Sequence, residues 1–319
     1  MKSLKRYYLS YLKNILIRET FFLIKYYIRN NRGNVNIDFV YMADGKMVHG
    51  GMFDRLKGAI SIYAISRVHG KRYGIYFTEP FLLEKYLEPN NYNWRVTDED
   101  LLFSFPQSRP IIAYSEKNSP SRLLRERDGQ THFYYGSDIL DFINQRYGTK
   151  YEWTTLFNEL FRPSPYLEEQ ISRLRKDVYG NYVAVHLRFL NMLGDKVEKL
   201  PYPELKEEGK HSLIADCITK IKELYNRNQG KNLFVSSDSI TFMEIVQKEI
   251  PTVMIVKGSS KHIDNSILSE DDCLKLFLDI YMLAGAERVY SIIGKGLYSS
   301  AFPEYSAKIG GKPFERIKL

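Results

Sequence analysis

The segment HGGMFDRLKGAISIYAISRVHGKRYGIYF, residues 49–77, decides how the first half of this chain folds. Gly50 and Gly51 come directly before a helical pattern at residues 55–69, and the apolar strand pattern YGIYF follows that helix. Another strand is expected just before the glycines, at residues 35–42. The order strand, glycine turn, helix, strand is typical of a βα unit in a parallel sheet. Because glycine lets a ligand or a facing loop approach the backbone closely, the turn is a candidate binding loop.

The alternation of strands and helices continues to the end of the chain. In the first half we expect further strands at residues 110–115 and 131–136 and a helix at 137–147. Two prolines and a charged helical pattern then indicate a domain boundary near Pro163. In the second half we expect strands at residues 182–189, 232–237, 252–256 and 288–293, with helices near 211–228, 239–249 and 269–286.

Length and composition favour two domains. The chain has 319 residues, of which 44% are hydrophobic, so it exceeds the usual size of one domain and can form sizeable cores. We therefore predict an α/β architecture in which a basic amphipathic arm, residues 1–32, precedes two α/β domains, residues 33–162 and 163–319, with a cleft between them. Cys217 and Cys273 are the only cysteines and form no C-x-x-C pair. Free thiols in a reducing cytoplasm are therefore expected, without disulfides or a zinc site.

Positive charge is concentrated in the arm. Its only acid is Glu19, and it holds +7 of the formal net charge of +8. Its basic residues are Lys2, Lys5, Arg6, Lys13, Arg18, Lys25, Arg29 and Arg32. The apolar runs are too short for a membrane span or a cleaved secretory signal, and no nucleic-acid reader motif accompanies them. We interpret the arm as a helix lying on an anionic membrane surface; the alternative is a helix at the domain edge with a solvated basic face.

Polar side chains stand at the end of the strand YVAVHLRF, residues 182–189. Side chains alternate along a strand, so His186 and Arg188 share one face while Leu187 and Phe189 share the other. An imidazole and a guanidinium at the end of a buried strand need an anionic or hydrogen-bonding group to meet them. One interpretation is that a ligand meets both side chains. The other is that Arg188 pairs with a local carboxylate and His186 has a hydrogen-bond partner in the core.

Two more strand ends have the same character. Asp238 follows the next strand directly before a helix, where a carboxylate either caps the helix or accepts hydrogen bonds from the ring N–H groups of a ligand. Gly294 and Gly296 follow the last expected strand and precede a helix expected to start at Leu297. Backbone N–H groups in such a turn form a phosphate cradle, although glycines also simply end strands. Since ligands of open α/β sheets bind beyond the carboxyl ends of the strands, these positions are candidates for one site.

Motifs for other chemistries are absent or ambiguous. The sequence contains no G-x-G-x-x-G, no Walker A loop and no H-E-x-x-H. Asp98 and Asp100 form a D-x-D pattern of the kind that holds a metal and a nucleotide diphosphate in one class of glycosyltransferases. Three acids before an apolar run are also typical of a helix N-terminus.

The segments VAVHLRF, FVSSDS and LDIYMLAGAERVYSIIGKGLYSSAF resemble the three C-terminal motifs of the fucosyltransferase superfamily. This superfamily includes bacterial nodulation fucosyltransferases, α1,6- and α1,2-fucosyltransferases and protein O-fucosyltransferases. Residues 49–77 resemble its N-terminal glycine loop and helix, and the matches run in the family's order from about residue 35 to the end of the chain. The resemblance implies the GT-B fold, in which two Rossmann-like α/β domains face each other across a cleft. It also implies that GDP-fucose is held mainly by the C-terminal domain, with no metal or other cofactor.

The resemblance also implies roles for individual residues. Arg188 would hold the β-phosphate and stabilise the leaving GDP, with His186 beside it and Asp238 reading the guanine edge. The turn that would cradle the diphosphate consists of Gly294, Lys295, Gly296, Tyr298 and Ser299. The loop that would close over the sugar and the acceptor contains Gly50, Gly51 and Asp54.

Two positions depart from the family's pattern, and the catalytic base is open. Phe189 stands where a second basic or polar residue usually follows the arginine, and Gly296 stands where a serine is expected. Candidate bases within reach of an acceptor hydroxyl are Asp54, Asp195 and Glu198, each of which could equally be a structural charge.

The sequence therefore predicts an inverting, metal-independent glycosyltransferase that moves fucose or a related sugar from a GDP-sugar. Its acceptor would be a glycan or a lipid-linked oligosaccharide at the inner, cytoplasmic face of a membrane. One alternative is a metal-dependent UDP-sugar transferase that acts through Asp98 and Asp100. The other is a non-catalytic, membrane-associated glycan-binding protein on a degenerate transferase fold.

Overall fold

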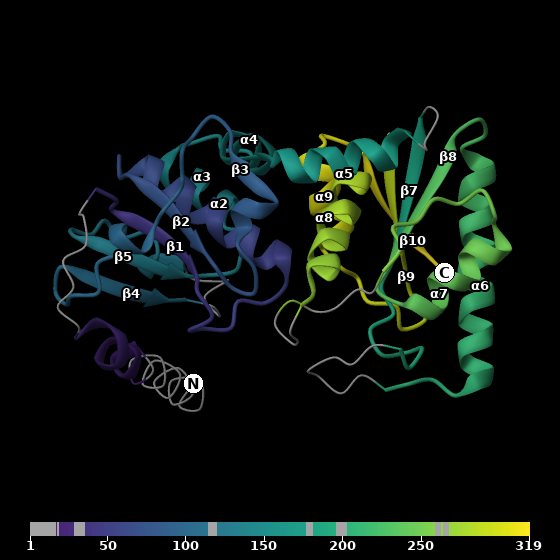
Figure 1. The fold of residues 1–319 in the computed structure, drawn as a ribbon, viewed down its shortest axis with the longest axis horizontal. Helices are drawn as coiled ribbons and strands as arrows, with labels where there is room; N and C mark the ends of the chain where they lie inside the picture. The colour runs from purple at the N-terminus through teal and green to yellow at the C-terminus, as the bar shows by residue number, and fades with distance from the viewer. Residues whose placement is uncertain are drawn as a thin grey trace. The chain divides into compact units, whose positions relative to one another are not determined.

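The chain forms two α/β units, which we describe separately (Figure 1). The computed structural model describes residues 17, 19–28, 36–113, 120–176, 181–195, 203–258, 263 and 268–319. Unit 1 comprises Met1–Leu82 and Pro89–Phe161, and unit 2 comprises Leu83–Glu88 and Arg162–Leu319. The short segment Leu83–Glu88, which we expected in the first domain, therefore groups with the second half of the chain. A two-stranded sheet of β3 (Leu87–Pro89) and β6 (Phe161–Pro163) lies where the chain passes between the units.

Unit 1 contains a four-stranded parallel sheet in the order β2-β1-β5-β4. Its strands are β1 (Phe39–Ala43), β2 (Tyr73–Phe77), β4 (Ser108–Ile112) and β5 (Gln130–Tyr134), and its helices are α2 (Met52–Val68), α3 (Leu140–Tyr147) and α4 (Trp153–Leu160). All five residues of β1 are buried, as expected for a central strand covered on both faces. The chain goes from β1 to β2 on one side, and β5 lies on the other side of β1.

Helix α2 carries the glycine loop at its start and is buried along most of its length. Gly51 is the N-cap residue, and the Asp54 carboxylate in the first turn accepts a hydrogen bond from the Gly51 N–H at 3.3 Å. At Gly58 an added Cβ atom would lie 2.2 Å from the carbonyl oxygen of Tyr135. Glycine there lets the helix approach the end of β5 closely, which fixes the position of the loop at its N-terminus.

Unit 2 contains a second four-stranded parallel sheet, in the order β10-β9-β7-β8. Its strands are β7 (Tyr182–Leu187), β8 (Asn232–Ser237), β9 (Arg288–Ile293) and β10 (Phe314–Lys318). Its helices are α5 (Pro165–Lys176), α6 (Glu207–Arg227), α7 (Ile240–Glu249), α8 (Glu270–Gly285) and α9 (Phe302–Ile309). Helices α6 and α7 lie on one face of the sheet, and α8 and α9 lie on the other (Figure 1).

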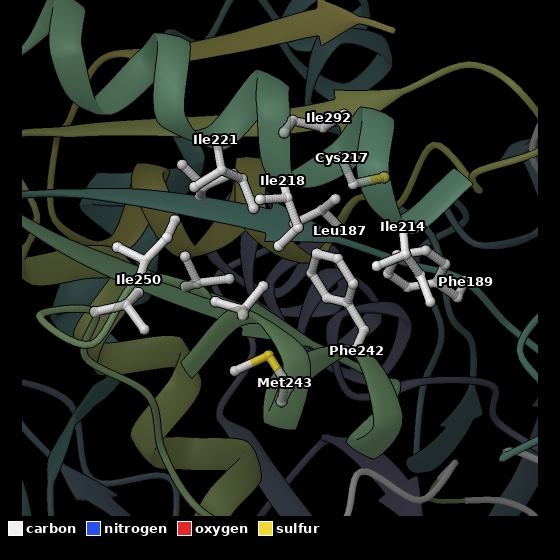
Figure 2. Packing of buried hydrophobic residues seen from close by; sticks show 14 of the residues in the cluster. Leu187, Phe189, Ile214, Cys217, Ile218, Ile221, Phe242, Met243, Ile250 and Ile292 are labelled. Carbon is white, nitrogen blue, oxygen red and sulfur yellow. The ribbon is translucent and has the colours of Figure 1, made fainter. Parts of the chain in front are cut away.

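The alternation predicted along β7 is confirmed by the packing of its two faces. Leu187 and Phe189 belong to the core that α6 and α7 close, where Phe189 packs on Phe242 with ring centroids 4.7 Å apart (Figure 2). On the opposite face the Tyr182 hydroxyl donates to the carbonyl of Met282 in α8 at 2.6 Å. Burying one large apolar side chain typically contributes about 1.5–3 kcal/mol, so this core holds the end of β7 firmly in place.

Two expectations about elements in unit 2 were wrong, and one strand was missed. Residues 252–256 form no strand, and only Met254 bridges to Phe234 of β8. The helix expected from Leu297 begins at Phe302, because residues 294–297 close a tight turn and residues 298–301 are not helical. Strand β10 was not expected, since its sequence FERIK is mostly charged; it lies at the sheet edge, where the side chains are partly solvated.

Part of the N-terminal arm belongs to the core of unit 1. Residues 19–27 are helical, and Phe22 and Tyr27 are buried against residues of β1 and β5. The Tyr27 hydroxyl oxygen lies 2.6 Å from Nδ1 of His132, which is also buried. One face of this stretch therefore packs against unit 1, and the membrane contact expected of the arm stays a prediction. Within the described residues no helix has the length and apolarity needed to cross a membrane.

Candidate functional site

The carboxyl ends of β7, β8 and β9 meet at one edge of the unit 2 sheet because these strands are parallel neighbours. The chain goes from β7 to β8 on one side and returns to β9 on the other side of β7. Such a reversal leaves a crevice at the strand ends, where open α/β sheets bind ligands. Three segments predicted as site components from separate parts of the sequence are therefore brought together there.

Arg188 follows β7 at this edge, and its side chain is 22% exposed. Its Nε lies 3.9 Å from Oδ2 of Asp238, and its guanidinium carbon lies 5.3 Å from the ring centroid of Tyr298. The Arg188 carbonyl also accepts a hydrogen bond from the Tyr298 N–H at 2.9 Å. A carboxylate and an aromatic face thus orient a guanidinium at the strand ends, and guanidinium geometry suits phosphate oxygens.

Asp238 at the end of β8 holds the loop that follows Arg188. Its two carboxylate oxygens accept hydrogen bonds from the N–H groups of Phe189 at 2.8 Å and Leu190 at 3.0 Å. Leu190 has a φ of +55°, a left-handed conformation that needs such support in a residue other than glycine. The structure therefore gives Asp238 a definite structural role, and its expected role in reading guanine stays a prediction.

The turn after β9 has an unusual backbone. Gly294, Lys295 and Gly296 have φ values of +100°, +49° and +92°, and an isolated bridge joins Gly294 to Leu297. At Gly296 the φ of +92° would strain any residue with a Cβ atom, and such an atom would also lie 2.8 Å from Cε of Met192, so glycine suits this position better than the expected serine. Lys295 Nζ pairs with Asp216 of α6 at 2.5 Å. The Leu297 N–H donates to the Gly294 carbonyl at 2.9 Å, so these residues close a tight turn, and its expected role as a diphosphate cradle stays a prediction.

The remaining residues of this turn are exposed, while His186 is not. Tyr298 is 45% exposed, and Ser299 also lies on the surface. His186 is buried on the α8 and α9 face, opposite Ser236 of β8 and Ser291 of β9, with its ring 5.5 Å from that of Phe302. The imidazole is therefore buried against Phe302, and its expected role beside the β-phosphate stays a prediction.

Of the two candidate bases after β7, Asp195 and Glu198, the structure describes only Asp195. Oδ2 of Asp195 accepts hydrogen bonds from the Ser239 hydroxyl at 2.7 Å and from the Thr241 N–H at 2.8 Å. Asp195 thus fastens its loop to the start of α7. Glu198 lies outside the described residues.

The glycine loop of unit 1 is at the carboxyl end of β1, where the chain order also reverses, between β1 and β5. Gly50 has a φ of +80°, and its carbonyl accepts a hydrogen bond from Nε of Arg55 at 3.3 Å. Asp54 caps the start of α2 and pairs with Lys57 at 3.0 Å, with its side chain 39% exposed. The loop is thus fixed by its own helix and keeps one accessible carboxylate.

His49, which directly precedes the two glycines, was missed by the sequence reasoning. It is 1% exposed, its ring stacks on Tyr134 of β5 at 5.8 Å, and neither ring nitrogen has a hydrogen-bond partner among the described residues. Burial, and secondarily the charge of Arg55, lowers its pKa to about 3, so it is neutral. The available signal was a polar side chain between a buried strand and a glycine turn.

The D-x-D pattern forms a single 3-10 turn, η2 (Asp98–Asp100). Asp100 accepts hydrogen bonds from the N–H and the hydroxyl of Thr97, both at 2.9 Å, and Asp98 accepts one from the Tyr76 hydroxyl. Across the residues that the structure describes, no group of three or more His, Cys, Asp or Glu side chains is placed to hold a metal ion. Both acids of the pattern thus have structural partners, as at a helix N-terminus.

The architecture is that of the GT-B fucosyltransferases. The crystal structure of fucosyltransferase NodZ from Bradyrhizobium is similar over 85% of this chain and 91% of its own, with a TM-score of 0.54 at 15% identity. NodZ α1,6-fucosyltransferase soaked with GDP-fucose gives 0.53 at 15% identity, covering 86% of this chain and 92% of that one. A mutant of FUT1 from Arabidopsis thaliana in complex with GDP gives 0.56 at 11% identity, covering 91% and 72%. No protein-family model and no curated protein sequence matches the chain.

Proposed function

We propose that this protein is an inverting glycosyltransferase that transfers fucose, or a closely related sugar, from a GDP-sugar without a metal ion. The observation that carries the proposal is Arg188 beside the positive-φ turn of residues 294–296, at the reversal point of the unit 2 sheet. Solved structures with this fold contain GDP or were soaked with GDP-fucose, which supports guanine as the base. We assign the donor to unit 2 and the acceptor side to the glycine loop of unit 1.

The proposed chemistry needs charge stabilisation more than covalent help. As the bond from the anomeric carbon to the β-phosphate oxygen breaks, its electron pair passes to GDP while the acceptor oxygen attacks from the opposite face. Arg188 and the N–H groups of the glycine turn would stabilise the negative charge that develops on the diphosphate. Removing one preorganised donor of this kind typically lowers the rate by ~10²–10³.

The proton of the acceptor hydroxyl needs a base. Of the two candidates that the structure describes, Asp54 has the more accessible carboxylate, since Asp195 is hydrogen-bonded to the start of α7. The acceptor we propose is a glycan or a lipid-linked oligosaccharide, and the reaction would take place at the cytoplasmic face of a membrane.

A thermal-shift panel tests the donor class. GDP, GDP-fucose, GDP-mannose, UDP and UDP-sugars are compared with EDTA and then with manganese. A ligand that binds only the folded state adds about 2.7 kcal/mol to the unfolding free energy at a hundredfold excess over Kd, so a clear shift is expected for guanine nucleotides in EDTA. A shift only with UDP and manganese would support the metal-dependent alternative. Glycan binding with neither donor binding nor donor hydrolysis would support the non-catalytic one.

A further inference from the structure

The helix near the N-terminus carries an apolar stripe that the protein leaves exposed. Ile17, Phe21, Ile24 and Ile28 are 50%, 74%, 55% and 64% exposed. At about 100° per residue their directions fall within roughly 60° of one another, so they form one continuous line along the helix. Large apolar side chains gathered on one face indicate an interaction surface, in contrast to apolar residues scattered singly.

The opposite face of the same helix is fixed to unit 1, so the stripe has a defined orientation. Phe22 is 6% and Tyr27 0% exposed, and Phe22 packs edge-on against Tyr134 with ring centroids 5.1 Å apart. The carbonyl of Tyr27 accepts a hydrogen bond from the N–H of Phe105 at 2.9 Å. The stripe therefore belongs to the folded domain as one side of a helix whose other side is core.

The charge around the stripe selects its partner. Glu19, the only acid in residues 1–32, turns into unit 1, where it pairs with Arg122 and accepts a hydrogen bond from the N–H of Ile112 at 2.9 Å. Lys25 is exposed on the helix. The basic residues of the arm thus have no acid within the arm to neutralise them.

A second basic group, on a different segment, lies beside Glu19. Arg109, Arg122 and Arg125 act together on Arg127, whose pKa falls to about 10 through burial first and their repulsion second. Of the nearby acids, Glu126 lies 3.6 Å from Lys71 in a pair of its own. Among the described residues, Lys25 and this arginine cluster therefore place positive charge on the part of unit 1 that carries the apolar stripe.

We propose that this face docks unit 1 on an anionic lipid bilayer, with Ile17, Phe21, Ile24 and Ile28 inserted at the boundary of headgroups and acyl chains. An exposed apolar line flanked by basic residues is the pattern of helices that lie in a membrane interface. A second copy of the chain is a poorer occupant, because two arms of the same positive charge would repel each other. Docking does not require the donor site, so the two can be tested apart.

The test uses point variants, because deleting the arm would expose the core around Phe22 and Tyr27. The double variant Phe21→Asp and Ile24→Asp is compared with Leu82→Asp, a control at a 63% exposed position of unit 1 that is not part of this helix. Flotation is measured with phosphatidylcholine vesicles and with vesicles that also contain phosphatidylglycerol. We expect the wild type and the control to bind only the anionic vesicles and the double variant to bind at least roughly tenfold more weakly.

A fluorescent label reports insertion directly. Cys217 and Cys273 are both buried, so an Ile24→Cys variant can be labelled selectively with an environment-sensitive dye. A blue shift on anionic vesicles supports insertion. Equal vesicle binding by the double variant and the wild type, or a stripe-dependent dimer in light scattering with no vesicle binding, would overturn the proposal. The GDP thermal shift is measured on the same variants and should not change, so failure of docking and failure of donor binding are seen separately.

Discussion

Arg188 is held from two sides by groups that leave its guanidinium partly accessible. Asp238 lies on one side, and its carboxylate keeps its two backbone hydrogen bonds to Phe189 and Leu190 when Arg188 is removed. Arg188→Ala is therefore expected to lower GDP affinity at least tenfold and turnover by ~10²–10³, with the melting temperature nearly unchanged. Arg188→Lys should restore only part of the affinity, because lysine cannot form the paired contacts of a guanidinium.

Arg227 supplies the matched control for this experiment. It is an exposed arginine of unit 2 that pairs with Glu315 at 3.1 Å, so Arg227→Ala should change neither GDP affinity nor turnover. Calorimetric titration with GDP measures the affinity of Arg188→Ala, Arg188→Lys and Arg227→Ala, and a thermal melt measures their stability. A large loss of stability in Arg188→Ala with GDP binding preserved would make the arginine structural.

The sequence could predict which strand ends lie side by side, but not every partner of the side chains there. His186 and Arg188 share a face because strand geometry has a period of two, and that pattern is readable without coordinates. Phe189 next to them faces the core, so the departure from the expected basic residue reflects packing against Phe242. The hydrogen bonds from backbone N–H groups to Asp238, and the lack of hydrogen-bond partners for the His49 ring among the described residues, depend on residues far apart in the sequence. No local sequence pattern indicates such contacts.

At the scale of elements, Asp195 connects the loop after β7 to the first turn of α7. Asp195→Ala removes the acceptor for the Ser239 hydroxyl and the Thr241 N–H, so the unfolding free energy should fall by about 1–2 kcal/mol. Asp195→Asn keeps an oxygen acceptor and should lose less. Urea denaturation measures the stability, and turnover at saturating acceptor tests the other role. If Asp195 were the general base, the Asn variant would be stable yet slower by ~10²–10⁴.

Elements with a strong apolar period could be predicted, and those shaped by tertiary contacts could not. Helix α7 was expected at residues 239–249 and spans Ile240–Glu249, and the β7 and β8 strands also lie where the pattern placed them. The apolar segment at 252–256 has the composition of a strand, yet Met254 alone bridges to β8. Helix α9 begins later than expected because residues 294–297 close a turn that only their backbone angles reveal.

At the scale of the whole molecule, acid and nucleotide should act on different units. Burial lowers the pKa of His49 and His132, both in unit 1, to about 3. Their pKa in the unfolded chain is about 6.5, so below that pH the unfolded chain takes up protons that the folded chain does not. The stability that depends on neutral histidine is therefore complete above pH 6.5 and is lost as the pH falls toward 3, by about 2 kcal/mol per histidine at pH 5. In unit 2, burial raises the pKa of Asp279, which opposes a loss on acidification.

Hydrogen exchange resolves the two units within one sample. When the pH falls from 7 to 5, protection factors corrected for intrinsic exchange should fall in β1 and β5 and change little in β7 and β9. Addition of GDP should raise the protection factors at the carboxyl ends of β7 and β9. His49→Phe keeps a ring against Tyr134 but cannot take up a proton, so it should remove about half of the acid effect in unit 1. An equal fall in both sheets that His49→Phe leaves unaltered would show that acid acts elsewhere. A ligand stabilises first the elements that it contacts. Protection by GDP in β1 without protection in β7 would therefore contradict the assignment of the donor site to unit 2.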